Sequence, residues 1–195
     1  MSVAVVDSGG ANLGSVLQAL NRLGADSQLT RDAECIQRAS HVILPGVGAA
    51  AAAMDALKQA GLVATLRQLR QPVMGICLGL QLLFERSEEG DVDCLGVLPG
   101  TIRALPEQAN LRLPHMGWNQ LSWQHSDPLS DGLAEQDWFY FVHSYAAPVE
   151  PALATSQHGH TFAAVVRKDN FAACQFHPEK SAGAGQRLLR NFLTQ

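Results

Sequence analysis

Cys77 is the residue of this sequence whose setting most favours nucleophilic chemistry. It lies in the string Gly-Ile-Cys-Leu-Gly at residues 75–79, directly after an apolar run and before a helical pattern. A side chain on such a sharp strand-to-helix turn is held out into a crevice, and the glycines allow a backbone that a Cβ would block. The start of the helix also favours a thiolate. The alternative is a small buried apolar residue, as many free cysteines are.

A nucleophilic cysteine needs a base, and the base needs a group that orients it. His177 follows an apolar run and precedes Pro178 and Glu179, and the proline stiffens the turn. Residues two apart in an extended segment share a side, so His177 and Glu179 can point together. On its own, the His-Pro-Glu string fits an ordinary loop histidine better than a catalytic base. Combined with Cys77, it predicts a triad of Cys77, His177 and Glu179.

Residues 45–48, Pro-Gly-Val-Gly, form a second glycine-rich turn after an apolar run. Backbone N–H groups of such a loop can stabilise a developing oxyanion, together with the N–H of Leu78 just after the nucleophile. An ordinary strand-to-helix turn or a phosphate cradle fits the same string. Its spacing matches neither a Walker A loop nor a dinucleotide fingerprint.

Other candidate groups carry weaker signals. His158 and His160 have no cysteine or acidic partner at a zinc spacing, so we expect a mobile loop there. The three tryptophans indicate core or an interface, because no basic residues are interleaved with them as in base-stacking proteins. Residues 7–10, Asp-Ser-Gly-Gly, fit an anion site or a plain turn equally well. No metal and no cofactor is predicted.

The elements that must position these groups alternate in the first hundred residues. Apolar runs predict strands at residues 3–6, 27–30, 41–44 and 72–76. Helical patterns predict helices at residues 13–23, with Asn12 as N-cap and Gly24 as its end, from Asp32, from Ala49 and directly after Cys77. Such alternation indicates βαβ units and a mostly parallel sheet covered on both faces.

The second half of the chain predicts strands with few helices between them. The expected strands are at residues 101–104, 120–123, 138–142, 162–167 and 171–176, with a hairpin turn at 168–170. A final helix is expected at residues 181–194. The predicted fold class is α/β, with a mixed, centrally parallel sheet flanked by helices. Because the sequence has no linker or repeat, we expect one domain over residues 1–195.

Composition excludes several classes of function. Charged residues are 16% of the 195, against a typical value of about 25%, and the net charge is −4. These values argue against disorder and against a protein that coats nucleic acid. No apolar run approaches the roughly 18–20 residues that span a bilayer, and no secretory signal is evident. Four cysteines without a C-x-x-C pair favour reduced thiols in the cytoplasm.

Two of these motifs resemble a known family. Residues 75–81 and 175–181, combined with residues 45–48, resemble the signatures of the class I (triad) glutamine amidotransferases, whose fold is flavodoxin-like. The similarity extends over essentially the whole chain. Three further segments, at residues 7–16, 114–119 and 139–145, resemble one subfamily, the glutaminase subunits of imidazole glycerol phosphate synthase in histidine biosynthesis. This chain departs from that pattern at Ser8, Ala11 and Gly14.

The resemblance implies a reaction. Cys77 would attack the side-chain carboxamide of L-glutamine, while N–H groups of Leu78 and of the loop at Val47 and Gly48 would hold the oxyanion. His177 would protonate the departing ammonia and then activate water, and Glu179 would orient it. The resemblance also implies residues that hold the amino-acid end of glutamine, namely Gly46, Gln81, Glu89, Ser144 and Tyr145.

The resemblance further implies a heterodimer. The glutaminase fold would fill the chain, and free ammonia in neutral water would be mostly protonated. A (βα)₈-barrel cyclase would therefore receive the ammonia through a closed passage, and form imidazole glycerol phosphate and aminoimidazole carboxamide ribotide. The segments around Trp118 and Tyr140 are candidate interface segments.

Two alternatives remain open for the function. One is a glutaminase that serves another synthase, in vitamin B6, anthranilate or guanine nucleotide synthesis, and residues 114–119 speak against it. The other is a binding subunit that has lost its chemistry, and an intact Cys77, His177 and Glu179 speaks against that.

Overall fold

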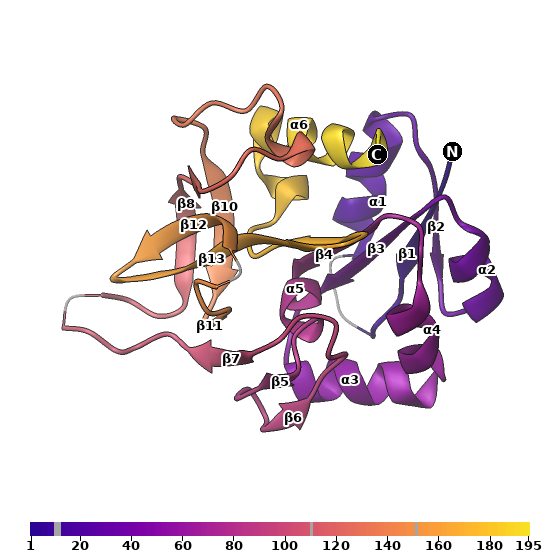
Figure 1. The fold of residues 1–195 in the computed structure, drawn as a ribbon, viewed down its shortest axis with the longest axis horizontal. Helices are drawn as coiled ribbons and strands as arrows, with labels where there is room; N and C mark the ends of the chain where they lie inside the picture. The colour runs from indigo at the N-terminus through magenta and orange to yellow at the C-terminus, as the bar shows by residue number, and fades with distance from the viewer. Residues whose placement is uncertain (10–12, 110, 151) are drawn as a thin grey trace.

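The chain folds around one large mixed sheet. The computed structural model describes residues 1–9, 13–109, 111–150 and 152–195 (Figure 1). The strand order of the sheet is β2-β1-β3-β4-β14-β13-β12-β9. Its parallel strands are β2 (Asp26–Thr30), β1 (Ser2–Val6), β3 (His41–Gly46), β4 (Val73–Cys77) and β14 (Phe171–Cys174). Its antiparallel extension is β13 (His160–Lys168), β12 (Ala152–His158) and β9 (Ser122–Trp123). The predicted α/β class is confirmed.

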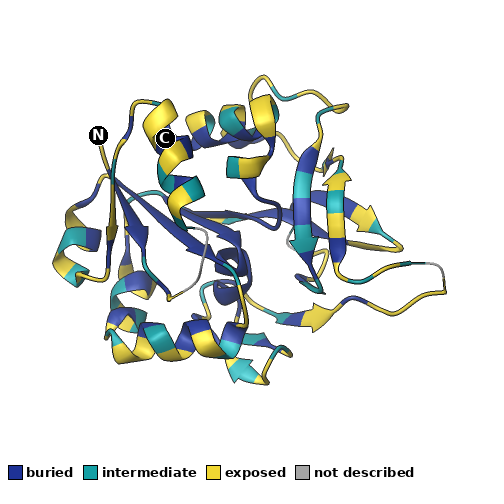
Figure 2. Ribbon diagram, turned by 180° about the vertical axis from the view of Figure 1, so that it is seen from behind, coloured by how far each residue is buried: buried dark blue, intermediate teal, exposed yellow. Residues whose placement is uncertain are grey.

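Helices cover both faces of this sheet, so its central strands are buried on both sides (Figure 2). One face carries α1 (Leu13–Arg22) and α6 (Ala182–Leu193), and the other carries α2 (Ala33–Arg38), α3 (Ala50–Gln59), α4 (Leu62–Gln68) and α5 (Leu78–Leu82). Alternate residues of β1 divide between the two cores: Val3 and Val5 face α1, whereas Ala4 and Val6 face the other layer. Strands buried on both faces explain the continuous apolar runs in the sequence.

Local signals fix the ends of the helices. The Asp32 side chain accepts hydrogen bonds from the N–H groups of Glu34 and Cys35, which caps α2. Gly24, at φ +75°, follows α1 in the left-handed conformation that glycine favours. The proposed cap Asn12 lies outside the described residues. Within those residues, no helix is both long and apolar enough to cross a membrane.

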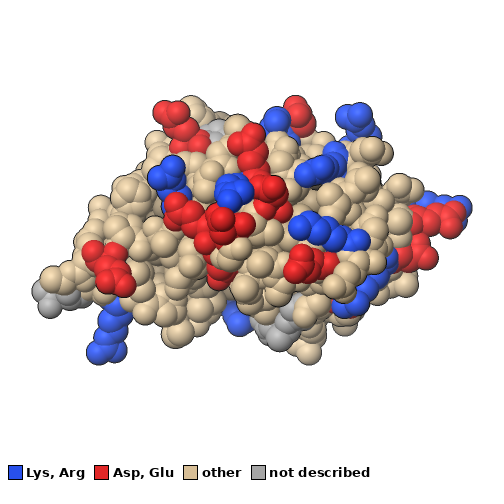
Figure 3. Space-filling model, turned by 90° about the horizontal axis from the view of Figure 1, so that it is seen from below, with Lys and Arg blue, Asp and Glu red and all other residues tan. Residues whose placement is uncertain are grey.

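Smaller sheets flank the large one. A ribbon pairs β8 (His115–Asn119) with β10 (Phe139–His143), and a second small sheet contains β11 (Tyr145–Ala146), β7 (Thr101–Ala104), β5 (Arg86–Ser87) and β6 (Val92–Asp93). Two single-turn 3₁₀ helices, η1 (Pro128–Ser130) and η2 (Pro178–Lys180), complete the elements. Acidic and basic side chains are mixed on the face that carries α3, β5 and β6 (Figure 3), where Arg86 pairs with Asp91 and Asp93.

Several expectations need correction. The sequence did not predict α4, β8 or β12, and β3 runs two residues further than expected, through Gly46. Where we expected a mobile loop, His158 and His160 end two strands of a hairpin that turns at Gly159. The sequence left core and interface open for the tryptophans, and Trp118 and Trp138 are half-exposed, which excludes the core for these two.

The segment after β1 forms a turn in its described part. The Asp7 carboxylate accepts a hydrogen bond from the Gly9 N–H at 2.9 Å and pairs with Arg31 at 2.9 Å. Both carboxylate oxygens of Asp7 therefore have partners within the chain. Of the two alternatives that the sequence left open, an anion site and a plain turn, these contacts favour the turn.

Candidate active site

Cys77 sits on a strained turn between β4 and α5. Its φ of +54° and ψ of −108° are outside the regions that ordinary residues adopt. Glycine makes this turn possible, because a Cβ on Gly79 would lie 1.7 Å from the Leu44 carbonyl oxygen and one on Gly75 would lie 2.8 Å from the Gly79 carbonyl. The elbow therefore packs backbone against backbone on β3. The Cys77 sulfur is 3.8 Å from the carbonyl oxygen of Val142 on β10.

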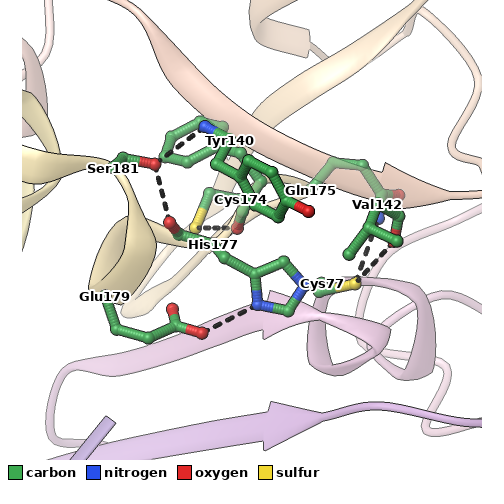
Figure 4. Close-up of polar contacts among 9 residues, drawn as sticks. Cys77, Tyr140, Val142, Cys174, Gln175, His177, Glu179 and Ser181 are labelled. Atoms are coloured by element: carbon green, nitrogen blue, oxygen red, sulfur yellow. Dashed lines mark hydrogen bonds and ion pairs between the residues drawn. The ribbon is translucent and has the colours of Figure 1, made fainter. Parts of the chain in front are cut away.

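His177 follows β14 and is held by hydrogen bonds at both its backbone and its ring. Its N–H donates to the Tyr140 carbonyl at 2.8 Å, and its Nδ1 contacts the Glu179 carboxylate at 2.8 Å. Figure 4 shows the other side of the imidazole turned toward the Cys77 sulfur. Nε2 is buried and makes no hydrogen bond with the described residues. The structure thus brings together the three residues of the predicted triad.

The charge of His177 depends on its two neighbours. Burial acts to lower its pKa, but the Cys77 sulfur and the Glu179 carboxylate outweigh burial and raise the pKa to about 10. The imidazole is therefore cationic at neutral pH. A cation beside a cysteine favours the thiolate, which is the nucleophilic form of sulfur.

A cavity of about 190 Å³ opens beside the sulfur. It is lined by Val47, Gly48, Cys77, Leu78, Gln81, Glu89, Val142, His143, Ser144, Tyr145 and His177. Gly46 is buried at the end of β3, where it pairs in register with Cys77. Every residue that the sequence analysis assigned to the site therefore lies at this cavity or next to it.

Two of the expected substrate-binding side chains are partly engaged within the protein. Glu89 accepts a hydrogen bond from the Ala50 N–H at 2.8 Å, at the start of α3, where Ala49 provides no side-chain cap. The Gln81 amide nitrogen donates to the Tyr145 carbonyl at 3.0 Å and to the Gln175 side-chain oxygen at 3.1 Å. Both hydrogens of that amide are thus used, and its oxygen is the atom that can meet a ligand.

The glycine loop at Val47 and Gly48 lines the same cavity. Gly48 adopts φ +99°, a conformation that glycine favours, and Val47 is half-buried. Leu78, the first residue of α5, lines the same cavity. The backbone of this loop and the Leu78 N–H therefore remain the predicted oxyanion donors.

Sequence reasoning missed two buried side chains at the site. Ser181 donates to the His177 carbonyl at 2.6 Å and accepts from the Tyr140 N–H at 2.9 Å, so it holds η2 to β10 (Figure 4). Gln175 has no exposed surface and places its amide nitrogen 3.8 Å from the Cys77 sulfur. Both lie inside residues 175–181, which the motif had singled out without giving either residue a role.

A pair of histidines, His143 and His115, lies beside the cavity. His143 contacts the Tyr145 carbonyl through Nδ1 at 2.8 Å and His115 through Nε2 at 3.0 Å. Burial lowers the pKa of His143 to about 3 and that of His115 to about 4. Both rings are therefore neutral at physiological pH. Across the described ranges, no cluster of three or more histidine, cysteine or acidic side chains is arranged to hold a metal ion.

Comparisons with known proteins agree with this geometry. A family model described as glutamine amidotransferase class-I matches residues 4–195. "Imidazole glycerol phosphate synthase subunit HisH" of Xanthomonas axonopodis pv. citri (strain 306) is 56% identical over 192 residues, 98% of this chain and 96% of that protein. "Imidazole glycerol phosphate synthase subunit HisH 2" of Legionella pneumophila (strain Paris) is 55% identical over 193 residues, 98% of this chain and 97% of that one.

A solved structure shares the fold at lower identity. The structure titled "Crystal structure of glutamine amidotransferase" superimposes with a TM-score of 0.75 at 23% identity, and covers 98% of this chain and 97% of that one. At this identity the likeness supports the architecture alone.

Proposed function

Because the chain belongs to the class-I glutamine amidotransferase family, we propose that it is the glutaminase subunit of an imidazole glycerol phosphate synthase. Its substrate is L-glutamine, and residues 1–195 act as one glutamine amidotransferase domain in the cytoplasm. The observation that carries the proposal is the contact of Glu179 with His177, whose ring faces Cys77 at the wall of a cavity.

In the first half-reaction, the Cys77 thiolate attacks the side-chain carbonyl carbon of glutamine. The carbonyl oxygen becomes an oxyanion, which the Leu78 N–H and the backbone of the loop at Val47 and Gly48 stabilise. The carbon–nitrogen bond then breaks as His177 gives its Nε2 proton to the leaving nitrogen. Ammonia departs and a thioester remains on Cys77.

In the second half-reaction, neutral His177 removes a proton from water while the oxygen attacks the thioester carbon. The carbon–sulfur bond breaks, glutamate leaves, and the thiolate–imidazolium pair forms again. The contact of Glu179 with Nδ1 fixes the ring orientation and stabilises the positive charge.

The remaining cavity residues orient the substrate. The Glu89 carboxylate pairs with the α-ammonium group of glutamine, and the Gln81 side-chain oxygen accepts a further hydrogen bond. Backbone groups of Gly46, Ser144 and Tyr145 hold the α-carboxylate end. These assignments are supported by the position of the residues around one cavity.

A partner receives the ammonia. The solvent side of the β8–β10 ribbon exposes Met116 and Trp118 opposite Val142 and Tyr140, and Val142 touches the Cys77 sulfur through its carbonyl. Apolar and aromatic exposure next to a reactive centre favours a protein interface. A (βα)₈-barrel cyclase docks here and uses the ammonia to form imidazole glycerol phosphate and aminoimidazole carboxamide ribotide in histidine biosynthesis.

The test is Cys77→Ala, assayed with the cyclase of the same organism and its nucleotide substrate. We expect glutamine-dependent synthesis to be abolished and ammonia-dependent synthesis to persist, because the variant removes only the source of ammonia. The matched control, Cys35→Ala, changes a partly exposed cysteine of α2 and should retain glutamine-dependent synthesis.

A second measurement identifies the reactive sulfur directly. A glutamine-mimicking electrophile should label Cys77, as found by mass spectrometry of the digested protein. Labelling of Cys35, Cys94 or Cys174 in its place would contradict the proposal, as would loss of both glutamine-dependent and ammonia-dependent synthesis in Cys77→Ala.

A further inference from the structure

Gln175 is a fully buried amide that contacts the nucleophile. It follows β14 directly, none of its surface is exposed, and its Nε2 is 3.8 Å from the Cys77 sulfur. An amide nitrogen can only donate, so this contact directs an N–H at the sulfur. A donor to sulfur stabilises the thiolate more than the thiol, because the negative charge strengthens the hydrogen bond.

The orientation of the Gln175 amide is fixed by a neighbour. Its oxygen accepts a hydrogen bond from the Gln81 nitrogen at 3.1 Å. The Gln81 nitrogen also donates to the Tyr145 carbonyl at 3.0 Å, and a carbonyl is only an acceptor. The Gln81 amide therefore cannot be reversed without losing that bond. Because Gln81 presents a donor to Gln175, the Gln175 oxygen must face Gln81 and its nitrogen must face Cys77.

The Tyr145 carbonyl is also held by a histidine. His143 reaches the Tyr145 oxygen through Nδ1 at 2.8 Å, so Nδ1 carries the hydrogen and Nε2 is an acceptor. His115 then donates from Nδ1 to that Nε2 at 3.0 Å. Both rings are almost completely buried. Every hydrogen bond in this series, from His115 to Gln175, thus has a defined donor and a defined acceptor.

We propose that Gln175 is a catalytic residue that donates a hydrogen bond to the Cys77 sulfur, and that Gln81 and the Tyr145 carbonyl orient its amide. The proposal rests on the proposed function, because it assigns a group that acts on the same nucleophile. Gln175 complements His177, which supplies charge from the other side of the sulfur (Figure 4). Buried polar groups of this kind are held firmly, because a broken hydrogen bond there has no water to replace it.

The titratable groups near this pair are few. The charge of Cys77 and Glu179 acts on His177, and that of His177 acts on His143. Cys174, buried on β14, lies within the same electrostatic environment. None of them is altered when Gln175 is replaced by a residue of the same size. A change in the pH dependence of Cys77 in the neutral variant Gln175→Leu can therefore be assigned to the Gln175 donor.

The experiment measures the rate at which iodoacetamide alkylates Cys77 between pH 4 and pH 10, by mass spectrometry of the Cys77 peptide. Gln175→Glu keeps the oxygen that Gln81 binds and replaces the donor with a carboxylate oxygen, whose negative charge adds to the effect of the lost donor. We expect the pH of half-maximal rate to rise, and the rate at a pH below both midpoints to fall about tenfold for each unit of that rise. The wild type and Gln175→Glu should reach the same limiting rate at high pH. A variant with a damaged site would not reach that rate.

Gln175→Leu removes the donor without adding an acceptor, so its profile should shift in the same direction but less. The matched control, Gln18→Leu on the exposed side of α1, should superimpose on the wild type. Profiles of both Gln175 variants that coincide with the wild type would overturn the inference. If Cys77 itself is not alkylated in the wild type, the proposed function fails instead, so the two failures are distinguishable.

A measurement on the wild type does not depend on whether the variants fold. The side-chain N–H signal of Gln175, followed by nuclear magnetic resonance, should shift over the same pH range in which alkylation of Cys77 rises. It should also shift when Cys77 is replaced by Ser. A signal that is insensitive to both changes would overturn the inference.

Discussion

Two buried histidines at the same cavity, His177 and His143, have opposite acid–base properties. His177 has 2% of its surface exposed and His143 has 6%, yet the pKa of His177 is raised to about 10 and that of His143 is lowered to about 3. Burial disfavours the cation in both rings. The difference lies in the partners, because His177 has a carboxylate and a sulfur, whereas His143 has a carbonyl and a second imidazole.

The charged pair, His177 with Glu179, also acts on the neutral pair, His143 with His115. The charge of His177 is one of the causes that keep the pKa of His143 low, after burial. A neutral His143 can accept the hydrogen bond from His115 while it donates to Tyr145, which a cationic ring could not do. The charged pair serves the reaction and the neutral pair holds the backbone of the cavity wall. Neither role can be inferred from burial alone.

The strongest way to break this contrast is Glu179→Gln, which gives His177 a neutral partner like that of His143. The pKa of His177 should fall, because the carboxylate that opposes burial is gone. Glutaminase activity in the assembled synthase should fall on the order of 10²- to 10⁴-fold, the range for loss of an orienting carboxylate. Histidine titration by nuclear magnetic resonance and glutamate release measure the two effects.

A control separates charge from packing in that comparison. Glu179→Asp keeps the charge and shortens the side chain, so activity should recover in part. An unchanged His177 titration in Glu179→Gln would contradict the assignment of the charge to this pair.

Acid sensitivity tests the neutral pair. The folded-state pKa values of His115 and His143 lie below the unfolded value of 6.5, so the unfolded chain binds more protons from pH 6.5 down toward pH 4. The free energy of unfolding should therefore fall as the pH decreases, by up to about 1.4 kcal/mol per pH unit for each histidine. Urea unfolding between pH 6.5 and pH 5 measures this slope.

His115→Phe sharpens the test. The ring stacking on Phe141 is retained, but one titrating group is removed, so the slope should decrease by about one proton. The control Leu20→Val lowers stability through the core and should leave the slope unchanged. A slope in His115→Phe equal to that of the wild type would show that His115 does not contribute.

The smallest expected effect is on stability, and it concerns Ser181, which links the His177–Glu179 pair to the strand of His143. Ser181 connects the carbonyl of His177 to the N–H of Tyr140, on the strand that carries His143. Ser181→Ala leaves the Tyr140 N–H without this partner and should lower the free energy of unfolding by about 1–2 kcal/mol. Chemical denaturation measures the loss, with the exposed Ser126→Ala as a neutral control. Loss of stability no greater than in that control would mean that Ser181 does not join the two elements.

Much of the fold could be predicted because its signals are local. The apolar runs of β1, β3 and β4 are buried on both faces, and Gly75 and Gly79 bracket a turn whose geometry depends on them. Helix α4 was missed because it follows α3 after a single glycine turn at Gly61. No strand lies between the two helices, so the sequence pattern did not indicate a second helix. Strand β12 was missed because its sequence ends in polar residues.

The polar network of the site could not be predicted in the same way. The contacts of Gln175 with Gln81 and Cys77 join residues 94 and 98 positions apart, and nothing in the local sequence indicates either contact. The pairing of His115 with His143 likewise depends on the register of β8 against β10. Residue types and spacing predicted which groups react, whereas the groups that orient them follow from tertiary packing.

The close contact between Gly79 and the Leu44 carbonyl has a mechanical consequence. No side chain separates Gly79, in the helix that begins after Cys77, from Leu44, in the strand that leads into the loop at residues 45–48, whereas Gly46 lies against the Leu78 side chain. A displacement of that loop, such as one imposed by a bound protein, is transmitted to the nucleophile through rigid main chain and not absorbed by rotamer changes. Access to the predicted oxyanion donors and the orientation of the Cys77 sulfur therefore change together.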